Sequence, residues 1–185
     1  MTTRNQRTLD EHYMRTALSL ALNGTASVSP NPRVGCVIVR DSAIIGSGWH
    51  RCCGEPHAEV EAVRNAGGDV RGATVYVNLE PCCHQGRTPP CAHMLIERGV
   101  SRVVVGMTDP NPKVDCMGER MLRDTGIEVT SGILEKESKW INRGFIRRMK
   151  MGRPWITLKT ACSLDGNIAL KDGSRSSVRD RNSPR

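Results

Sequence analysis

Two short stretches of the sequence carry side chains that could bind a metal and move a proton. The first, PHAEVEA, holds His57 and, two residues later, Glu59. The second, EPCCHQGRTPPC (residues 80–91), holds Cys82 directly after a proline and Cys91 after an excursion of eight residues. One imidazole and two thiolates make three protein ligands, and zinc held by three ligands keeps a fourth position for water, which is typical of catalytic sites.

Glu59 is placed to move a proton beside such a metal. A helix is expected to begin after Pro56, and the partial positive charge of a helix N-terminus keeps an imidazole neutral, as His57 must be to bind a metal. Zinc brings the pKa of a bound water toward ~7, and the Glu59 carboxylate can take that proton and hand it to a leaving group. This chemistry suits the amidine carbon of an aminopyrimidine, from which the amino group leaves as ammonia.

Other ligand sets stay open from the residues alone. Cys83 is adjacent to Cys82 and could take its place, while Cys52 and Cys53 lie close in the sequence to His57. A fourth protein ligand, for instance Cys83 or Cys53, would enclose the metal and make a structural zinc module instead of an enzyme. Because no secretory leader is visible, we expect reduced thiols, and clustered reduced thiols favour metal binding or catalysis over disulfides.

Composition and charge limit the class of protein. A chain of 185 residues is long enough for one domain and a fragment of another. Residues 1–135 carry 14 basic and 15 acidic side chains, a net charge of −1, whereas residues 136–185 carry 13 and 4, a net charge of +9. The basic excess lies away from the thiols, which argues against a nucleic-acid partner. We expect no membrane partner, because no long apolar run is present, and a cytoplasmic location, because the N-terminus lacks an apolar leader.

Helix and strand signals alternate along the chain. Apolar stripes and breakers predict helices over residues 8–22, 57–66, 89–98, 114–125 and 133–151, and strands over residues 34–39, 43–50, 73–79, 102–107 and 127–132. Thr8 and Glu11 have the spacing of a capping box at the start of the first helix, and Gly144 should break or weaken the last. The alternation indicates a layered α/β domain with helices on both faces of a sheet of about five strands.

Several separated motifs resemble one known family. HAEVEAV, NLEPCCHQGRTPPC and GMTDPNP, together with SPNPRVGCVIV and GSGWH, resemble the N-terminal deaminase of the bifunctional riboflavin-pathway deaminase/reductase. The usual signature of zinc nucleobase deaminases is H-x-E…P-C-x-x-C, and the eight-residue spacing seen here is that of this family instead. The resemblance covers about residues 9–150 and implies a three-layer α/β/α cytidine-deaminase-like domain with a central mixed sheet of about five strands.

The resemblance also implies residue roles. It implies that His57, Cys82 and Cys91 hold one zinc ion per chain and that Glu59 is the proton shuttle. It places these further residues at the substrate pocket: Asn31, His50, His84, Arg87, Asp109 and Asn111. The family often has lysine where Arg87 stands, so the geometry of the donor differs at that position.

Simpler interpretations of the pocket residues stay open. Asn31 lies between two prolines and could be a turn former. His84 and Arg87 could be donors that stabilise their loop, and Asp109 and Asn111 could cap the helix that follows.

The implied activity is the zinc-dependent hydrolytic deamination of 2,5-diamino-6-(ribosylamino)-4(3H)-pyrimidinone 5′-phosphate to 5-amino-6-(5-phosphoribosylamino)uracil. The partner is then a small pyrimidine nucleotide, and a homo-oligomer is expected because members of the family generally associate. The alternatives are a cytidine or nucleic-acid deaminase of the same superfamily and a non-enzymatic structural zinc module.

A second, shorter resemblance covers the C-terminal segment. After a boundary near residues 149–154, RPWITLKTACSLDGNIAL is similar to the first strand of the family's dihydrofolate-reductase-like reductase, which uses NADPH. We therefore expect a deaminase domain over residues 1–150 and the truncated start of a reductase over residues 151–185. We expect NADPH only in the full-length family, and disorder in the polar tail KDGSRSSVRDRNSPR.

Overall fold

A computed structural model of the chain describes residues 3–83, 90–111, 116–169, 171 and 173–174. His84 and Arg87, both predicted at the substrate pocket, lie outside the described residues. The chain forms two compact units, Met1–Pro154 and Trp155–Arg185, and each is described by itself. In the described part of the chain, no helix is both long and apolar enough to span a membrane.

The first unit is built on one mixed sheet of five strands. In chain order these are β1 (Gly35–Arg40), β2 (Ala43–Trp49), β3 (Thr74–Val77), β4 (Arg102–Val105) and β5 (Glu128–Ser131), and in space the order is β2-β1-β3-β4-β5. β1 pairs antiparallel with β2 and β3, whereas β3, β4 and β5 run parallel to one another. The predicted mixed sheet of five strands is confirmed.

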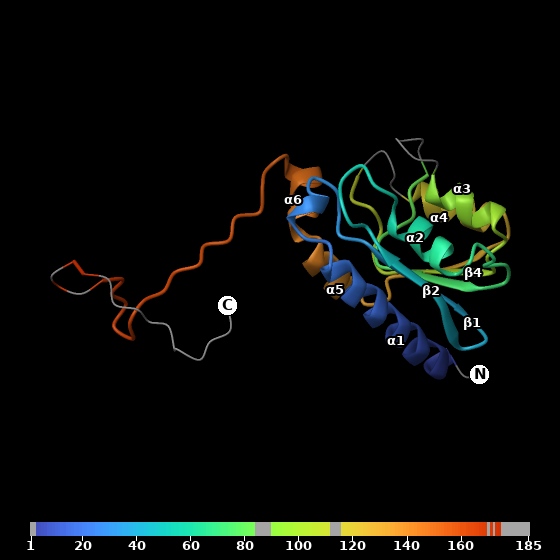
Figure 1. The fold of residues 1–185 in the computed structure, drawn as a ribbon, viewed down its shortest axis with the longest axis horizontal. Coiled ribbons are helices and arrows are strands. Elements are labelled where there is room, and N and C mark those ends of the chain that lie inside the picture. Colours follow the sequence, from blue (N-terminus) through green and yellow to red (C-terminus); the bar gives the residue numbers. More distant parts are fainter. Residues whose placement is uncertain (1–2, 84–89, 112–115, 170, 172, 175–185) are drawn as a thin grey trace. The chain divides into compact units, whose positions relative to one another are not determined.

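Helices cover both faces of this sheet (Figure 1). They are α1 (Thr3–Leu22), α2 (Ala58–Asn65), α3 (Cys91–Glu97), α4 (Met117–Asp124), α5 (Glu135–Ile141) and α6 (Arg143–Met151), with a short 3₁₀ turn at Ala26–Val28. Side chains of α1 and α5 pack in one apolar cluster with one face of the strands, and side chains of α2, α3 and α4 pack in a second cluster with the other face. The predicted three layers are therefore confirmed.

Strand periodicity explains how one sheet contributes side chains to both apolar clusters. Along β3, Val75 and Val77 belong to the cluster under α2, α3 and α4, whereas Tyr76 belongs to the cluster under α1. Successive side chains of a strand point to opposite faces, so a continuous apolar run serves both. Close contact needs Gly48 in β2, where a Cβ would lie 2.7 Å from the backbone nitrogen of Ala62. α2, and with it His57, is thereby held directly against the sheet.

Three predicted boundaries were wrong. α1 begins at Thr3 and not at Thr8, whose hydroxyl donates within the helix to the carbonyl of Arg4 instead of capping it. The described part of the predicted helix over residues 114–125 is α4, Met117–Asp124. The last helix breaks at Asn142 and not at Gly144, because the Asn142 side chain bonds to a distant loop.

The second unit does not contain the predicted strand. Trp155, Ile156 and Leu158 alternate as in a strand but are exposed, and the segment pairs with no other strand among its described residues. A strand needs a partner for its backbone groups and for one face, and the residues of this unit that the structure describes supply neither. A turn follows, in which Asn167 Nδ2 donates to Asp165 Oδ2 at 2.7 Å. Most of the tail expected to be disordered lies outside the described residues.

Candidate active site

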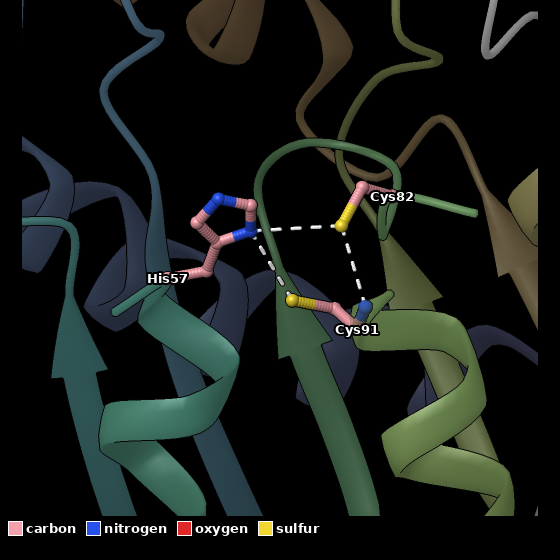
Figure 2. Close-up of side chains that lie close together, drawn as sticks. All are labelled: His57, Cys82 and Cys91. Atoms are coloured by element: carbon pink, nitrogen blue, oxygen red, sulfur yellow. Dashed lines mark hydrogen bonds between the residues drawn. The ribbon is translucent and has the colours of Figure 1, made fainter. Parts of the chain in front are cut away.

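Three side chains from separate elements meet at one point (Figure 2). His57 is the residue before α2, Cys82 follows β3, and Cys91 opens α3. His57 Nδ1 lies 3.6 Å from Cys82 Sγ and 3.3 Å from Cys91 Sγ, and the potential ligand atoms all lie within 4.8 Å of one another. Neighbouring nitrogen and sulfur ligands of a tetrahedral zinc lie about 3.6 Å apart, so the three side chains fit the ion.

Local sequence explains this convergence. His57 has extended backbone angles, φ −71° and ψ 162°, because it precedes the first turn of α2. Pro90 has φ −59° and precedes α3, so Cys91 emerges at the first turn of that helix. The backbone N–H of Cys91 donates to Cys82 Sγ at 3.3 Å, which stabilises negative charge on that sulfur.

The other cysteines proposed as alternative ligands are not in this cluster. Among the described residues, the group of possible metal ligands contains His57 and two cysteines, and neither Cys83, Cys52 nor Cys53 belongs to it. Cys83 is half-buried and Cys53 is exposed. Among the described residues, three side chains are therefore grouped so that they could hold a metal ion, and three protein ligands are the arrangement of a catalytic site.

The electrostatics of the triangle also favour a cation. The pKa of the Cys82 thiol is lowered, first by its hydrogen bond with Cys91 and also by His57. The hydrogen bond to Cys82 raises the pKa of His57, so the expectation that the helix N-terminus alone keeps this imidazole neutral was wrong for the metal-free chain. The pKa of Cys91 is raised by its hydrogen bond to Cys82 and by burial. Without a metal, protons on these three groups therefore offset the negative charge of the sulfur atoms. A bound metal cation would replace those protons, because metal ligands must be thiolates and neutral imidazoles.

Glu59 lies in the first turn of α2, beside the triangle, and only 3% of its surface is exposed. Burial raises the pKa of its carboxyl group, although the neighbouring His57 works in the opposite direction. Glu59 lines a cavity of about 210 Å³ that His57 and Cys82 also line. A water molecule or substrate in this cavity would meet the metal position and the carboxylate together.

Four of the six predicted pocket residues line the same cavity: Asn31, His50, Asp109 and Asn111. The remaining two, His84 and Arg87, lie outside the described residues. The structure thus brings together residues that are widely separated in the sequence.

His50 determines how Asn31 is presented. His50 Nδ1 lies 3.1 Å from the carbonyl oxygen of Pro56, and its Nε2 lies 3.0 Å from Asn31 Nδ2. A carbonyl only accepts, so Nδ1 carries the proton, and Nε2 accepts from the Asn31 amide. Burial lowers the pKa of His50, which favours this neutral form. The Asn31 carboxamide is therefore fixed in one orientation at the cavity wall.

Sequence reasoning missed other residues of the cavity wall. Glu80 lines it from the end of β3, and Phe145 lines it from α6. Phe145 belongs to an apolar stripe that predicts only a packed helix face, so no local pattern distinguishes it. Glu80 stands in the conspicuous cysteine stretch, but the partners of its carboxylate lie far along the chain.

The layered fold, the His-Cys-Cys triangle and the buried carboxylate define a metal-dependent deaminase. The sequence model of the family described as the cytidine and deoxycytidylate deaminase zinc-binding region matches residues 7–107. The chain belongs to this family.

Comparisons with individual proteins agree with the resemblance inferred from the sequence and confirm it. The chain is 52% identical over 164 residues to riboflavin biosynthesis protein RibD of Escherichia coli K12, a match that covers 89% of this chain and 45% of that protein. It is also similar to the structure of Acinetobacter baumannii RibD, form 2, with a TM-score of 0.85, 47% identity and coverage of 93% and 49%.

A third similar protein is the diaminohydroxyphosphoribosylaminopyrimidine deaminase/5-amino-6-(5-phosphoribosylamino)uracil reductase of Thermotoga maritima. Its structure matches with a TM-score of 0.91 and 43% identity, covering 96% of this chain and 51% of that one. The chain therefore spans about half the length of the relatives it matches.

Proposed function

We propose that this chain catalyses the hydrolytic deamination of 2,5-diamino-6-(ribosylamino)-4(3H)-pyrimidinone 5′-phosphate to 5-amino-6-(5-phosphoribosylamino)uracil, a step towards riboflavin. The observation that carries the proposal is a His-Cys-Cys triangle that shares one cavity with a buried glutamate. The choice of substrate rests on the similarity to RibD of Escherichia coli and to the Thermotoga maritima protein, which is described as a deaminase of this pyrimidine class.

His57, Cys82 and Cys91 would hold one zinc ion per chain. Zinc bound there supplies a Lewis-acid position that lowers the pKa of water and polarises it for attack. The ligand atoms have the separations that a tetrahedral zinc requires, and the family is described as zinc-binding.

Glu59 would carry the proton. Its carboxylate takes one proton from the attacking water and delivers it to the pyrimidine ring nitrogen beside the reacting C2 as the C–O bond forms. It then takes the second proton from the hydroxyl group left on C2 and delivers it to the amino group, which departs as ammonia as the C–N bond breaks. Burial supports this role, because it brings the pKa of a carboxyl group closer to neutral pH, where it both accepts and donates effectively.

Asn31 would bind the pyrimidine edge. A carboxamide offers a donor and an acceptor, which matches a ring that presents N–H and C=O groups side by side. His50 orients that amide through Nε2, so it acts through Asn31. The apolar side chains of Leu79, Val34 and Phe145 line the same cavity and would exclude bulk water.

The two units suggest a division of roles. We assign the deaminase to Met1–Pro154, and we propose that residues from Trp155 onward correspond to the opening of the reductase that follows the deaminase in the relatives. NADPH is assigned to no described residue of this chain. A homo-oligomer and a cytoplasmic location stay predictions.

Ammonia release from the diaminopyrimidine nucleotide by zinc-loaded protein tests the proposal. Glu59→Gln should keep its zinc and lose activity by about 10²–10⁴-fold, the usual contribution of a general acid–base group. Glu61→Gln is a matched control, because Glu61 lies on the same helix and pairs with Arg64 at 3.0 Å. Undiminished activity in Glu59→Gln, or faster turnover of cytidine than of the diaminopyrimidine, would contradict the proposal.

A further inference from the structure

We propose that Glu80 is a positioning residue that holds the backbone around Asp109 against the substrate cavity and thereby sets the affinity for substrate. The inference rests on the proposed function for the identity of that substrate. Glu80 lines the cavity, and only 3% of its surface is exposed. It is neither a member of the metal-binding triangle nor the proposed proton shuttle.

The Glu80 carboxylate accepts hydrogen bonds from four backbone amides of one distant segment. Oε2 accepts from Asp109 at 3.1 Å and from Cys116 at 3.3 Å, while Oε1 accepts from Gly118 at 3.0 Å and from Glu119 at 3.3 Å. A carboxylate has about four acceptor sites, so these amides occupy its full capacity. One side chain therefore fixes both ends of the segment from Asp109 to Glu119.

Glu80 also caps the N-terminus of α4. Cys116 stands at the N-cap position of α4 with a left-handed backbone, φ 61°, and its side chain makes no capping hydrogen bond. Amides in the first turn of a helix need an acceptor, and a carboxylate there also interacts favourably with the helix dipole. Glu80, 36 residues away from Cys116 in the sequence, meets both needs.

Gly118 makes this contact sterically feasible. A Cβ on Gly118 would lie 2.1 Å from the carbonyl oxygen of Pro81, the residue after Glu80. Backbone cannot yield at such a distance, so a side chain at this position would push α4 away from the loop that carries Cys82. The first turn of α4 therefore packs directly against the segment that follows β3.

The position of Glu80 explains why this contact should affect substrate binding. Its own backbone is held at the sheet, because Glu80 N donates to the carbonyl of Met107 at 2.9 Å. Its side chain then determines where Asp109 and Asn111 stand on the cavity wall. Loosening that wall should weaken substrate binding, whereas Glu59 and its helix are held by other contacts and should keep the chemical step.

The variant Glu80→Gln tests this division. An amide retains one acceptor oxygen but turns an N–H group toward two of the four backbone donors. We expect KM to rise about tenfold or more and kcat to change less than about twofold, the signature of lost binding that is uniform along the reaction. Bound zinc should stay at the wild-type level. A KM equal to that of the wild type, or a fall in kcat as large as the rise in KM, overturns the inference.

Glu119→Gln is the matched control. Glu119 is a buried carboxylate in the first turn of the same helix, but its Oε2 accepts from Ser131 at 2.6 Å and from Arg123 at 2.9 Å. If loss of a buried charge in α4 were enough to raise KM, Glu119→Gln would raise it as much as Glu80→Gln, and the inference would be wrong. We expect a KM close to that of the wild type.

Amide hydrogen exchange gives a readout that does not depend on turnover. In Glu80→Gln, exchange at Asp109, Cys116, Gly118 and Glu119 should accelerate, while exchange in β1 stays at the wild-type rate; equal rates at those four amides overturn the inference. If Glu80→Gln does not fold, Glu80→Asp serves in its place, because it keeps the carboxylate but shortens its reach, and it should show the same pattern. A wild-type chain that releases no ammonia would contradict the proposed function, and the exchange comparison would still decide the role of Glu80.

Discussion

The side chain of Asn142 is bonded to both polar groups of the Arg33 backbone. Asn142 Oδ1 accepts from Arg33 N at 2.8 Å, and Asn142 Nδ2 donates to Arg33 O at 3.0 Å. Asn142 is buried between α5 and α6, and Arg33 stands two residues after Asn31. One amide therefore joins the loop that carries Asn31 to the start of the helix that carries Phe145, and Asn31 and Phe145 both line the same cavity.

Asn142→Ala should loosen the contact between the loop that carries Asn31 and the helix that carries Phe145. The change leaves the Arg33 N–H without this partner, and an unsatisfied buried donor costs about 1–3 kcal/mol. We expect the free energy of unfolding, measured by urea titration, to fall by that amount, and KM for the diaminopyrimidine to rise. Asn65→Ala is the control, because Asn65 donates to Ser47 O at 2.7 Å on the surface and its loss should cost less than about 0.5 kcal/mol. Equal stability losses in the two variants would contradict the assignment.

Two adjacent cysteines offer a sharp test of the metal ligands. Cys82→Ser should lose most of its zinc, because serine replaces a thiolate whose Sγ faces His57. Cys83→Ser should keep about one zinc per chain, since Cys83 is outside the triangle. Metal analysis of the two purified proteins, prepared side by side under reducing conditions, measures this difference. Loss of zinc from Cys83→Ser would support a metal enclosed by four protein ligands.

Removal of the metal from the wild-type chain should reversibly reduce both its activity and its stability. A chelator should abolish ammonia release and lower the melting temperature, because an ion that binds only the folded state stabilises it. Added zinc should restore both. Full activity in a preparation shown by metal analysis to be free of metal would contradict a metal-dependent reaction.

Stability at low pH should depend on Asp10. Burial by itself raises the pKa of Asp10, but hydrogen bonds from Arg102, Gln6 and Tyr76 hold that pKa below its ordinary value of 3.8. A carboxyl group whose pKa is depressed by folding contributes stability above its unfolded pKa and loses it as the pH falls through the folded pKa. Wild-type stability should therefore drop as the pH falls below 3.8.

Asp10→Asn isolates this contribution. Arg102 approaches Asp10 at 2.7 Å, so the variant should be less stable at neutral pH and should show a shallower fall in stability under acid conditions. Urea titrations at a series of pH values measure both effects. Glu97→Gln is the control, since Glu97 is exposed and pairs only with His93 among the described contacts. An acid profile of Asp10→Asn identical to that of the wild type would contradict the argument.

The features that could be predicted are those determined by residues close together in the sequence. Val75, Tyr76 and Val77 predict a strand buried on both faces, and the structure confirms it. The stretch around His57 and Glu59 predicts that both lie at the start of one helix, and the structure places them there. The grouping of His57, Cys82 and Cys91 was also expected, from the resemblance to a known family. The structure shows that their potential ligand atoms lie within 4.8 Å of one another.

The parts that could not be predicted depend on contacts between distant segments. Nothing near Glu80 indicates that its four donors lie in and before α4, and nothing near Asn142 indicates a bond to Arg33. The prediction of a strand beginning at Trp155 was wrong for a related reason. An alternating pattern indicates that a strand can form, but it does not show whether a partner strand is present.

X-ray absorption at the zinc edge, which measures the ligands around the bound zinc, is the decisive experiment for a catalytic metal site. We expect two sulfur ligands at about 2.3 Å and two lighter ligands at about 2.0–2.1 Å, one from His57 and one from an exchangeable water. In Glu59→Gln the same two sulfurs and two lighter atoms should remain. A third sulfur ligand, or a sphere without an exchangeable water, would contradict the claim that this site is catalytic.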